Sequence, residues 1–233
     1  MGNANYAWIL HFLHHLAPPN GKGGGIAAFV MANGSLSSNT GGEGDIRKQL
    51  IENDLVDCII AMPPQLFLTT GIPVCLWFIT RDKSGKHLDK GRGGRDRSGE
   101  TLFINASTMG QMEEGSRTIR FLTGRDDESS PPGKDTDIGR IARAYHAWRG
   151  EKEAGEYANI KGFCYAANLE EMRTHRHVLT PGVYVGSATD EEDDEPFDDK
   201  MTRLVAELKG QLVTSNSLTK KISSNLEAIG YEL

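Results

Sequence analysis

The sequence predicts an α/β fold followed by a helical C-terminal region. Over residues 1–110, short apolar runs rich in β-branched and aromatic residues alternate with segments of helical periodicity. Apolar runs of this kind are typical of strands that are covered on both faces. From residue 197 onward, apolar residues recur at nearly heptad spacing for about 33 residues, which corresponds to roughly 50 Å of helix. These observations separate a layered α/β part from a long C-terminal helix.

The first elements are expected in the order helix, strand, helix, strand. Tyr6, Ile9 and Leu13 lie on one helical face, and prolines at 18 and 19 end that helix. The elements that follow are a strand at 26–32, a helix at 45–53 and a strand at 55–61. This alternation favours parallel pairing, because a parallel connection needs room for a crossover.

The next two strands follow shorter connections. The loop 62–73 is too short for a helical crossover, so the run 74–80 is expected to return antiparallel beside 55–61. Residues 102–105 are expected to add a small edge strand. We also expect the strands that begin near Ile26, Leu55 and Val74 to be mutually adjacent and to leave an apolar edge uncovered.

The rest of the sequence is polar or helical. Residues 111–135 are polar, helical spacing returns from 138 to 148, and Asn168 is the expected N-cap of another short helix. Eight acidic residues between 190 and 199 precede or begin the last helix. We therefore predict three regions: 1–110 with the sheet, 111–186 as a mostly helical extension, and 187–233 with the long helix.

The composition excludes several classes of protein. A net charge of -6 argues against a chain that holds nucleic acid through its overall field, although a local basic patch could still do so. The three cysteines form no Cys-x-x-Cys pair, so neither a disulfide framework nor a zinc site is indicated. His11 and His15 lie one helical turn apart, but no carboxylate or cysteine accompanies them, so we expect no metal site. No apolar stretch approaches the roughly 18 residues of a membrane span, and no cleavable signal is evident, so we expect a cytoplasmic protein.

A local basic patch is present between residues 81 and 97. This segment contains seven basic residues and three aspartates, with glycine and serine residues between them. Lys86, Arg92 and Arg95 are the candidates for contacts with DNA phosphates, which position a protein without reading sequence. A solvated hairpin loop is the alternative interpretation of the same residues.

Two loops carry further candidate residues. The polar, glycine-rich segment 33–44 follows a strand, where α/β sheets place ligand-binding loops. We interpret Asn33, Ser35 and Ser37 as an active-site rim or DNA-facing surface, with a plain connection as the alternative. Ser35 lacks the Gly-x-Ser-x-Gly pattern of a nucleophile elbow. In the second loop, a Leu66-Phe67 pair stands between prolines and two buried runs.

Three segments closely resemble the modification subunit of type I restriction-modification systems, an N6-adenine DNA methyltransferase. They are the run from Asn3 to Lys83, "LTPGVYVG" at 179–186, and "DEEDDEPFDDKMTRLVAEL" at 190–208. The resemblance covers nearly the whole chain in the family's order. It implies part of a SAM-dependent methyltransferase (Rossmann-like) sheet, with 1–110 as the C-terminal half of the catalytic domain.

The resemblance also implies what the chain lacks. In the family, the loop that binds S-adenosylmethionine and the Asn-Pro-Pro-Phe motif lie upstream of the segment that matches Asn3, and neither occurs here. We expect a C-terminal portion that is inactive alone, holds no cofactor, and needs the missing N-terminal half of the modification subunit. The complete enzyme would use S-adenosylmethionine to methylate adenine N6. A non-enzymatic remnant that docks a specificity subunit is the alternative.

The resemblance assigns a role to Phe67. Such enzymes rotate the target base out of the duplex, and Phe67 matches the aromatic that stacks on the flipped adenine. A loop aromatic tucked under the sheet is the alternative. The implied partners are DNA, the specificity subunit through the last helix, and the restriction subunit through the complex. The alternative for that helix is folding back on its own domain, and Val183 stands where the family usually has a basic residue.

Overall fold

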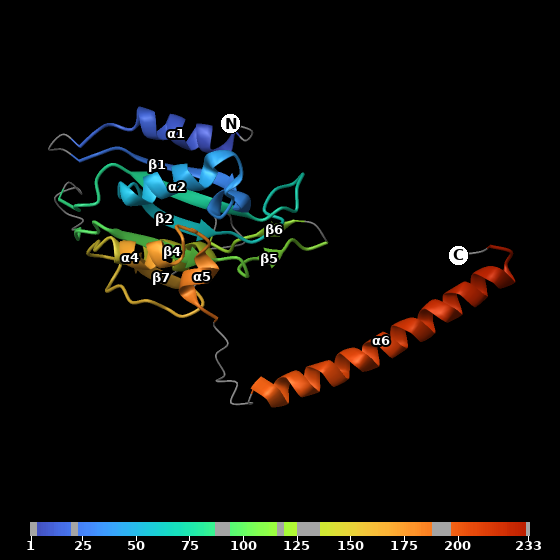
Figure 1. Ribbon diagram of the computed structural model, residues 1–233. Helices are drawn as coiled ribbons and strands as arrows, with labels where there is room; N and C mark the ends of the chain where they lie inside the picture. The colour runs from blue at the N-terminus through green and yellow to red at the C-terminus, as the bar shows by residue number, and fades with distance from the viewer. Residues whose placement is uncertain are drawn as a thin grey trace. The chain divides into compact units, whose positions relative to one another are not determined.

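The computed structural model describes residues 4–19, 23–86, 94–115, 119–124, 136–187 and 197–231. The chain divides into two compact units, Met1–Ala188 and Thr189–Leu233. The first unit holds every strand that the structure describes, and the second holds one long helix (Figure 1). The calls that fall on residues 87–93, 125–135 and 188–196, including Arg92, lie outside the described residues.

A five-stranded sheet forms the centre of the first unit. Its order is β1 (Ile26–Ala32), β3 (Val74–Thr80), β2 (Val56–Ala61), β4 (Glu100–Asn105) and β7 (Cys164–Asn168). β2 and β4 pair in parallel, and the other neighbours pair antiparallel. Because β1 and β2 are both antiparallel to β3, the strands β1, β2 and β4 run in the same direction. A separate two-stranded ribbon joins β5 (Gln111–Met112) to β6 (Arg120–Phe121).

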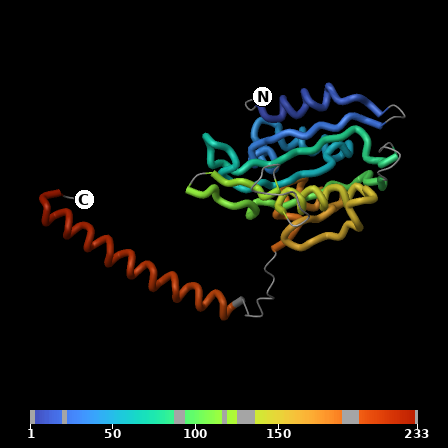
Figure 2. The backbone as a smooth tube through the Cα atoms, turned by 180° about the vertical axis from the view of Figure 1, so that it is seen from behind, coloured from blue at the N-terminus to red at the C-terminus, as the bar shows by residue number. Residues whose placement is uncertain are grey.

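Helices cover both faces of this sheet. One face packs against α1 (Asn5–His15), α2 (Glu43–Glu52), α4 (Leu169–Thr174) and α5 (Pro181–Val185). The other packs against α3 (Asp137–Trp148), which lies on the near side in the view from behind (Figure 2). Two short 3₁₀ turns, Asn33–Leu36 and Thr40–Gly42, connect β1 to α2.

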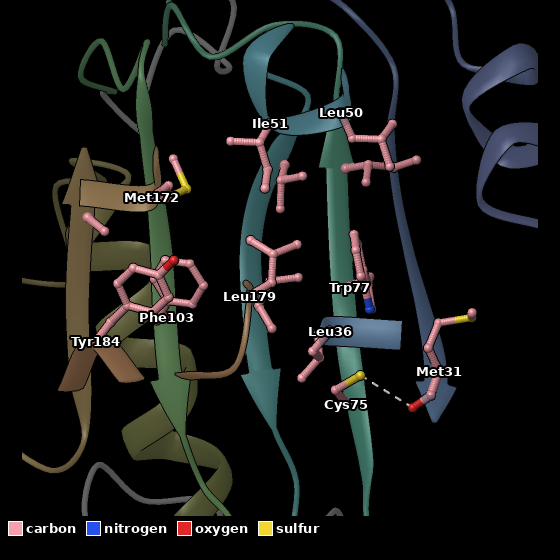
Figure 3. Packing of buried hydrophobic residues seen from close by; sticks show 14 of the residues in the cluster. Met31, Leu36, Leu50, Ile51, Cys75, Trp77, Phe103, Met172, Leu179 and Tyr184 are labelled. Atoms are coloured by element: carbon pink, nitrogen blue, oxygen red, sulfur yellow. Dashed lines mark hydrogen bonds between the residues drawn. The ribbon is translucent and has the colours of Figure 1, made fainter. Parts of the chain in front are cut away.

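The first core cluster shows why these runs form strands. Alternate residues of each strand point to the same face, so Cys75 and Trp77 of β3 and Phe103 of β4 lie on one face of the sheet and belong to one core cluster, with β2 between the two strands (Figure 3). The Phe103 ring stacks on that of Tyr184 from α5, with 3.8 Å between ring centroids. This contact joins the "LTPGVYVG" segment to the sheet.

The second face is covered unevenly. Trp148 of α3 is fully buried there with residues of β2, β4 and β7. On β1, in contrast, Ile26 and Val30 of this face are each 49% exposed. Among the described residues, β1 is therefore an edge strand with a half-exposed apolar face, which agrees with the expectation of an apolar edge.

The strand order differs from the expectation in two ways. β3 lies between β1 and β2, so the strands at Ile26 and Leu55 are not neighbours, although each pairs with the strand at Val74. Residues 102–105 form part of the interior strand β4 rather than an edge strand, because β7 pairs with its far side. The segment 111–186, expected to be mostly helical, therefore contributes a strand to the same sheet.

Local signals for the helices are confirmed. α2 begins two residues earlier than expected and buries Leu50 and Ile51. Asn168 caps α4 in a capping box, in which its side chain accepts from the Glu171 backbone while the Glu171 carboxylate accepts from the Asn168 backbone.

The second unit is dominated by α6 (Phe197–Ala228), a helix of 32 residues. Eight of its apolar side chains are exposed by 42 to 70%: Met201, Leu204, Val205, Leu208, Leu212, Val213, Leu218 and Ile222. No helix in the described ranges is long and apolar enough to cross a membrane.

Candidate active site

Three parallel-running strands end together at one end of the sheet, here called the carboxyl end. Ala32 of β1 pairs with Val74, Ala61 of β2 pairs with Cys75, and Asn105 of β4 pairs with Ala61. The segments that follow these strands, including the loop 62–73, therefore start side by side. Ligands of α/β sheets bind at this end of the strands.

The loop 62–73 has a fixed shape. Gln65 adopts a left-handed backbone conformation with φ 68°, and its carbonyl accepts a 2.8 Å bond from the Arg120 amide of β6. Phe67 and Thr70 form an isolated antiparallel bridge. The Thr70 hydroxyl accepts from the Ile72 amide at 3.3 Å. The ribbon β5–β6 and these local bonds hold the loop against the sheet.

The tip of this loop is apolar and exposed. Phe67 is 41% exposed, Leu68 80% and Ile72 63%, and these three residues are called the apolar tip below. The loop carries no charged residue between Met62 and Val74. A neutral, apolar protrusion suits stacking on a base rather than contact with a phosphate. The Phe67 ring is thus half-exposed, and its role as a base-stacking residue stays a prediction.

Ser35 does not lie on an exposed rim. It is 1% exposed, its hydroxyl accepts a 3.1 Å bond from the Trp77 indole, and its carbonyl accepts a 2.6 Å bond from the Tyr6 hydroxyl. This corrects its assignment to an active-site rim or DNA-facing surface, because the hydroxyl satisfies a buried indole. Asn33 is half-buried, and its Oδ1 has no hydrogen-bond partner among the described residues, while Ser37 is exposed.

The glycine-rich segment 33–44 is filled by its own side chains. Arg47 of α2 is 1% exposed and donates to the Ser38 carbonyl at 2.7 Å and to Asn39 Oδ1 at 3.0 Å. Its Nε donates to the His177 carbonyl at 2.8 Å. A Cβ atom at Gly44 would collide with the Asn39 amide. The segment therefore leaves no cradle that fits S-adenosylmethionine.

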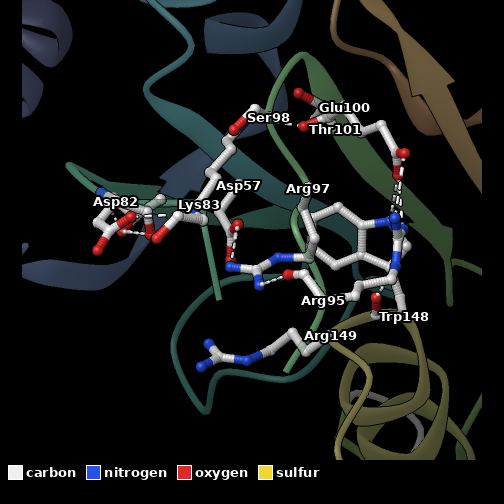
Figure 4. Close-up of polar contacts among 12 residues, drawn as sticks. Asp57, Asp82, Lys83, Arg95, Arg97, Ser98, Glu100, Thr101, Trp148 and Arg149 are labelled. Carbon is white, nitrogen blue, oxygen red and sulfur yellow. Dashed lines mark hydrogen bonds and ion pairs between the residues drawn. The ribbon is translucent and has the colours of Figure 1, made fainter. Parts of the chain in front are cut away.

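Much of the basic patch is used in buried ion pairs. Lys83 is 2.6 Å from Asp54, and Arg97 is 3.4 Å from Asp57, which is fully buried (Figure 4). Burial lowers the pKa of Lys83, against the opposing effect of Asp54. The first pair fastens the segment after β3 to the turn before β2, and the second fastens the segment before β4 to β2 itself.

Arg95 is also held by the fold. Its guanidinium pairs with Glu100 at 2.5 Å, its Nε donates to the Trp148 carbonyl at 2.5 Å, and its guanidinium carbon lies 5.5 Å from the Trp148 ring centroid. Hydrogen bonding from Arg95 lowers the pKa of Glu100. Among the described candidates for phosphate contact, only Lys86 is exposed and outside such a pair.

The described residues of the basic patch, 81–86 and 94–97, lie at the end of the sheet opposite the apolar tip. The patch follows Thr80, which pairs with Ile26 at the start of β1, and precedes Glu100 at the start of β4. The apolar tip lies beyond Ala61, where β2 ends. The structure therefore does not bring Lys86 and Arg95, the described candidates for phosphate contact, together with Phe67.

Sequence reasoning missed the buried carboxylate Asp57. Besides Arg97, it accepts a 3.0 Å bond from the Tyr145 hydroxyl of α3, and burial raises the pKa of that tyrosine. An aspartate inside an apolar run was the available signal. The rings of His11 and His15 lie 4.4 Å apart, and no cluster of three potential metal ligands occurs in the part of the chain that the structure describes.

Comparison with known proteins gives consistent relatives. The chain is 42% identical over 231 residues to the type I restriction enzyme HindI methylase subunit of Haemophilus influenzae, covering 99% of this chain and 45% of the relative. It is 40% identical to the MjaIX methylase subunit of Methanocaldococcus jannaschii, covering 99% of this chain and 36% of that relative. The chain thus spans less than half the length of these relatives.

Solved structures show the same fold. The type I methyltransferase subunit from Streptococcus thermophilus superposes with a TM-score of 0.56 at 25% identity, covering 79% of this chain and 30% of that one. The EcoKI M protein superposes with a TM-score of 0.53 at 16% identity, covering 99% of this chain and 45% of that one. The model of the N-6 DNA methylase family matches residues 1–193. On this evidence, the chain belongs to the N-6 DNA methylase family.

Proposed function

We propose that this chain is part of a type I restriction-modification methyltransferase that methylates adenine N6 in a specific DNA sequence. The apolar tip at the carboxyl end of the sheet, in a member of the N-6 DNA methylase family, carries the proposal. A methylase must extrude its target base and hold it by stacking and by hydrogen bonds. Phe67, half-exposed on a fixed loop, is suited to stack on that base.

The other catalytic parts of the proposed enzyme belong to the part of the modification subunit that this sequence does not cover. S-adenosylmethionine supplies the methyl group in the complete enzyme, and the family resemblance assigns its binding loop and the Asn-Pro-Pro-Phe motif to a preceding segment. The segment 33–44 does not fit the cofactor, because Arg47 and Asn39 fill it. The contribution of this chain is to orient the base.

We propose that the N-terminal half of the modification subunit packs against the free edge of strand β1. Within the described residues, β1 pairs only with β3, so its other side presents unpaired N–H and C=O groups. Ile26 and Val30, each 49% exposed, extend this edge into an apolar face. A strand added at β1, with a helix over Ile26 and Val30, would satisfy both the backbone groups and the apolar surface.

The C-terminal helix is assigned to subunit contact. α6 exposes apolar residues from Met201 to Ile222, about six turns or about 32 Å at about 1.5 Å per residue, and such a stripe needs a covering partner. We propose the specificity subunit as that partner, with the restriction subunit and DNA joined through the complex. The second candidate function is a non-enzymatic module that docks the specificity subunit, and the same apolar stripe supports it.

The test combines the chain with the part of the HindI methylase subunit that it does not cover and with a specificity subunit. We expect the assembled proteins to transfer labelled methyl groups from S-adenosylmethionine to duplex DNA, and N6-methyladenine to be the product. The controls are this chain alone with the specificity subunit and the complementary part of the methylase alone with the specificity subunit. Assembly without methyl transfer would instead support the docking module, and failure to assemble would contradict both assignments.

A further inference from the structure

Leu68 is held in an unusual position. It is 80% exposed, the largest exposed fraction among the large apolar residues that the structure describes. Its neighbour Phe67 is half as exposed, at 41%. Phe67 and Thr70 close a tight turn, with the Thr70 amide 3.4 Å from the Phe67 carbonyl, and Leu68 is one of the two central residues of that turn. The ring of Phe67 therefore packs partly against the protein while Leu68 projects from it.

Prolines and a backbone hydrogen bond restrict the loop that carries Leu68. Pro63, Pro64 and Pro73 restrict its two ends. The Gln65 carbonyl is bonded to the β5–β6 ribbon through the Arg120 amide at 2.8 Å. Because these contacts hold the backbone, Leu68 cannot retract toward the core without breaking them. An apolar side chain fixed in water in this way indicates a partner.

We propose that Leu68 enters the duplex at the target step and fills the space that the extruded adenine leaves. The inference rests on the proposed function, in which Phe67 stacks on the extruded base itself. Leucine is among the apolar side chains that proteins insert between base steps. Filling the vacated space restores stacking to the neighbouring bases, so the extruded state becomes more populated.

Two observations favour DNA over a protein partner for Leu68. The loop 62–73 lies at the carboxyl end of the sheet, where the substrate of an α/β enzyme binds, and it carries no charge. Leu68 is also the most exposed residue of the short apolar tip, whereas the exposed apolar residues of α6 form an extended stripe. A short apolar tip suits the gap left by one base better than it suits an extended protein surface.

The experiment uses the assembled methylase and two DNA substrates. One is a duplex with the target adenine paired to thymine, and the other places an abasic site opposite that adenine, which makes extrusion less costly. We expect Leu68→Ala to slow single-turnover methylation of the paired duplex by about tenfold and to leave the abasic duplex near the wild-type rate. Phe67→Ala should slow both substrates.

Matched variants control for folding and for size. Leu68→Met should retain most of the rate on the paired duplex, because it keeps an apolar side chain of similar volume. Ile160→Ala, which shortens a residue that is 52% exposed and outside the proposed site, should match the wild type on both substrates. Leu68→Ala should melt with the wild type, because its side chain packs on little else.

Three results would overturn the inference. They are an unchanged rate for Leu68→Ala on the paired duplex, equal slowing on both substrates, and loss of assembly with the complementary part, which would make Leu68 a protein contact. Inactivity of the wild-type assembly on both substrates would instead contradict the proposed function.

Discussion

Alanine substitutions at Phe67 and Phe78 should separate base stacking from core packing. The two rings lie eleven positions apart, one on the apolar tip and one in β3. Phe78 packs in the second core cluster, with its ring centroid 5.2 Å from that of Tyr145. Phe67 is 41% exposed. The same truncation therefore removes buried contacts at one site and mostly an exposed surface at the other.

The expected loss of stability differs by about 2 kcal/mol. Truncating a core phenylalanine to alanine costs about 3 to 5 kcal/mol, and because Phe78 is half-buried we expect about 3 kcal/mol. For Phe67, the free energy of burying a phenylalanine side chain, scaled by the fraction that is buried, gives about 1 kcal/mol. In a unit of this size, 1 kcal/mol corresponds to about 2 to 4 °C in Tm, so the two variants should melt about 4 to 8 °C apart.

Tryptophan fluorescence can follow these melts, because Trp77 and Trp148 are fully buried in the first unit. Methylation by the assembled enzyme supplies the second readout. Loss of stacking costs about 1 to 3 kcal/mol per base, so Phe67→Ala should lower the methylation rate roughly 5- to 150-fold. If Phe67→Ala melts as early as Phe78→Ala and methylates normally when folded, Phe67 is a packing residue and the stacking assignment is wrong.

Three further predictions concern the ion pairs and the cofactor. Arg97→Met should lower the free energy of unfolding, measured in urea, by about 3 to 5 kcal/mol, because it leaves the buried Asp57 carboxylate without its cation. A loss below about 1 kcal/mol, which is typical of a surface ion pair, would contradict this. Hydrogen bonds from Arg173 and then His177 lower the pKa of Glu52 from 4.5 to about 2. The stability from this pair is present above pH 4.5 and is lost as the pH falls toward 2, so the difference in urea midpoint between wild type and Glu52→Gln should shrink across that range. Calorimetry of the purified chain should detect no micromolar binding of S-adenosylmethionine.

Most strands were predictable from the sequence, but their order was not. Apolar runs such as 55–61 and 74–80 identify buried strands, because β-branched and aromatic residues suit a pleated, covered surface. Periodicity does not report neighbours, and β3 enters between β1 and β2. β7 is not predicted because "CYAAN" contains no β-branched residue, and without β7 the strand at 102–105 is expected at the edge.

The candidate site shows a similar division. The prolines around Phe67 predicted an exposed aromatic at the end of a strand, since proline and the strand boundary are local features. The environment of Ser35 was not predictable, because its hydroxyl accepts a hydrogen bond from the indole of Trp77, which lies 42 positions away in the sequence. Charge counting over 81–97 failed for the same reason, since the partners of Lys83 and Arg97 lie 29 and 40 positions away.

These distant partners bear on how the complete enzyme would hold DNA. A contact with a flipped base supplies little of the affinity for duplex DNA, most of which comes from neutralised phosphates and varies with salt. Lys83, Arg95 and Arg97 are paired with carboxylates and lie at the end of the sheet away from the apolar tip. The chain as a whole carries a charge of -6. In the enzyme we propose, Lys83, Arg95 and Arg97 are therefore not the cations that hold the duplex beside Phe67, and we expect the specificity subunit and the rest of the modification subunit to supply many of them, while this chain supplies the apolar contacts that favour base extrusion.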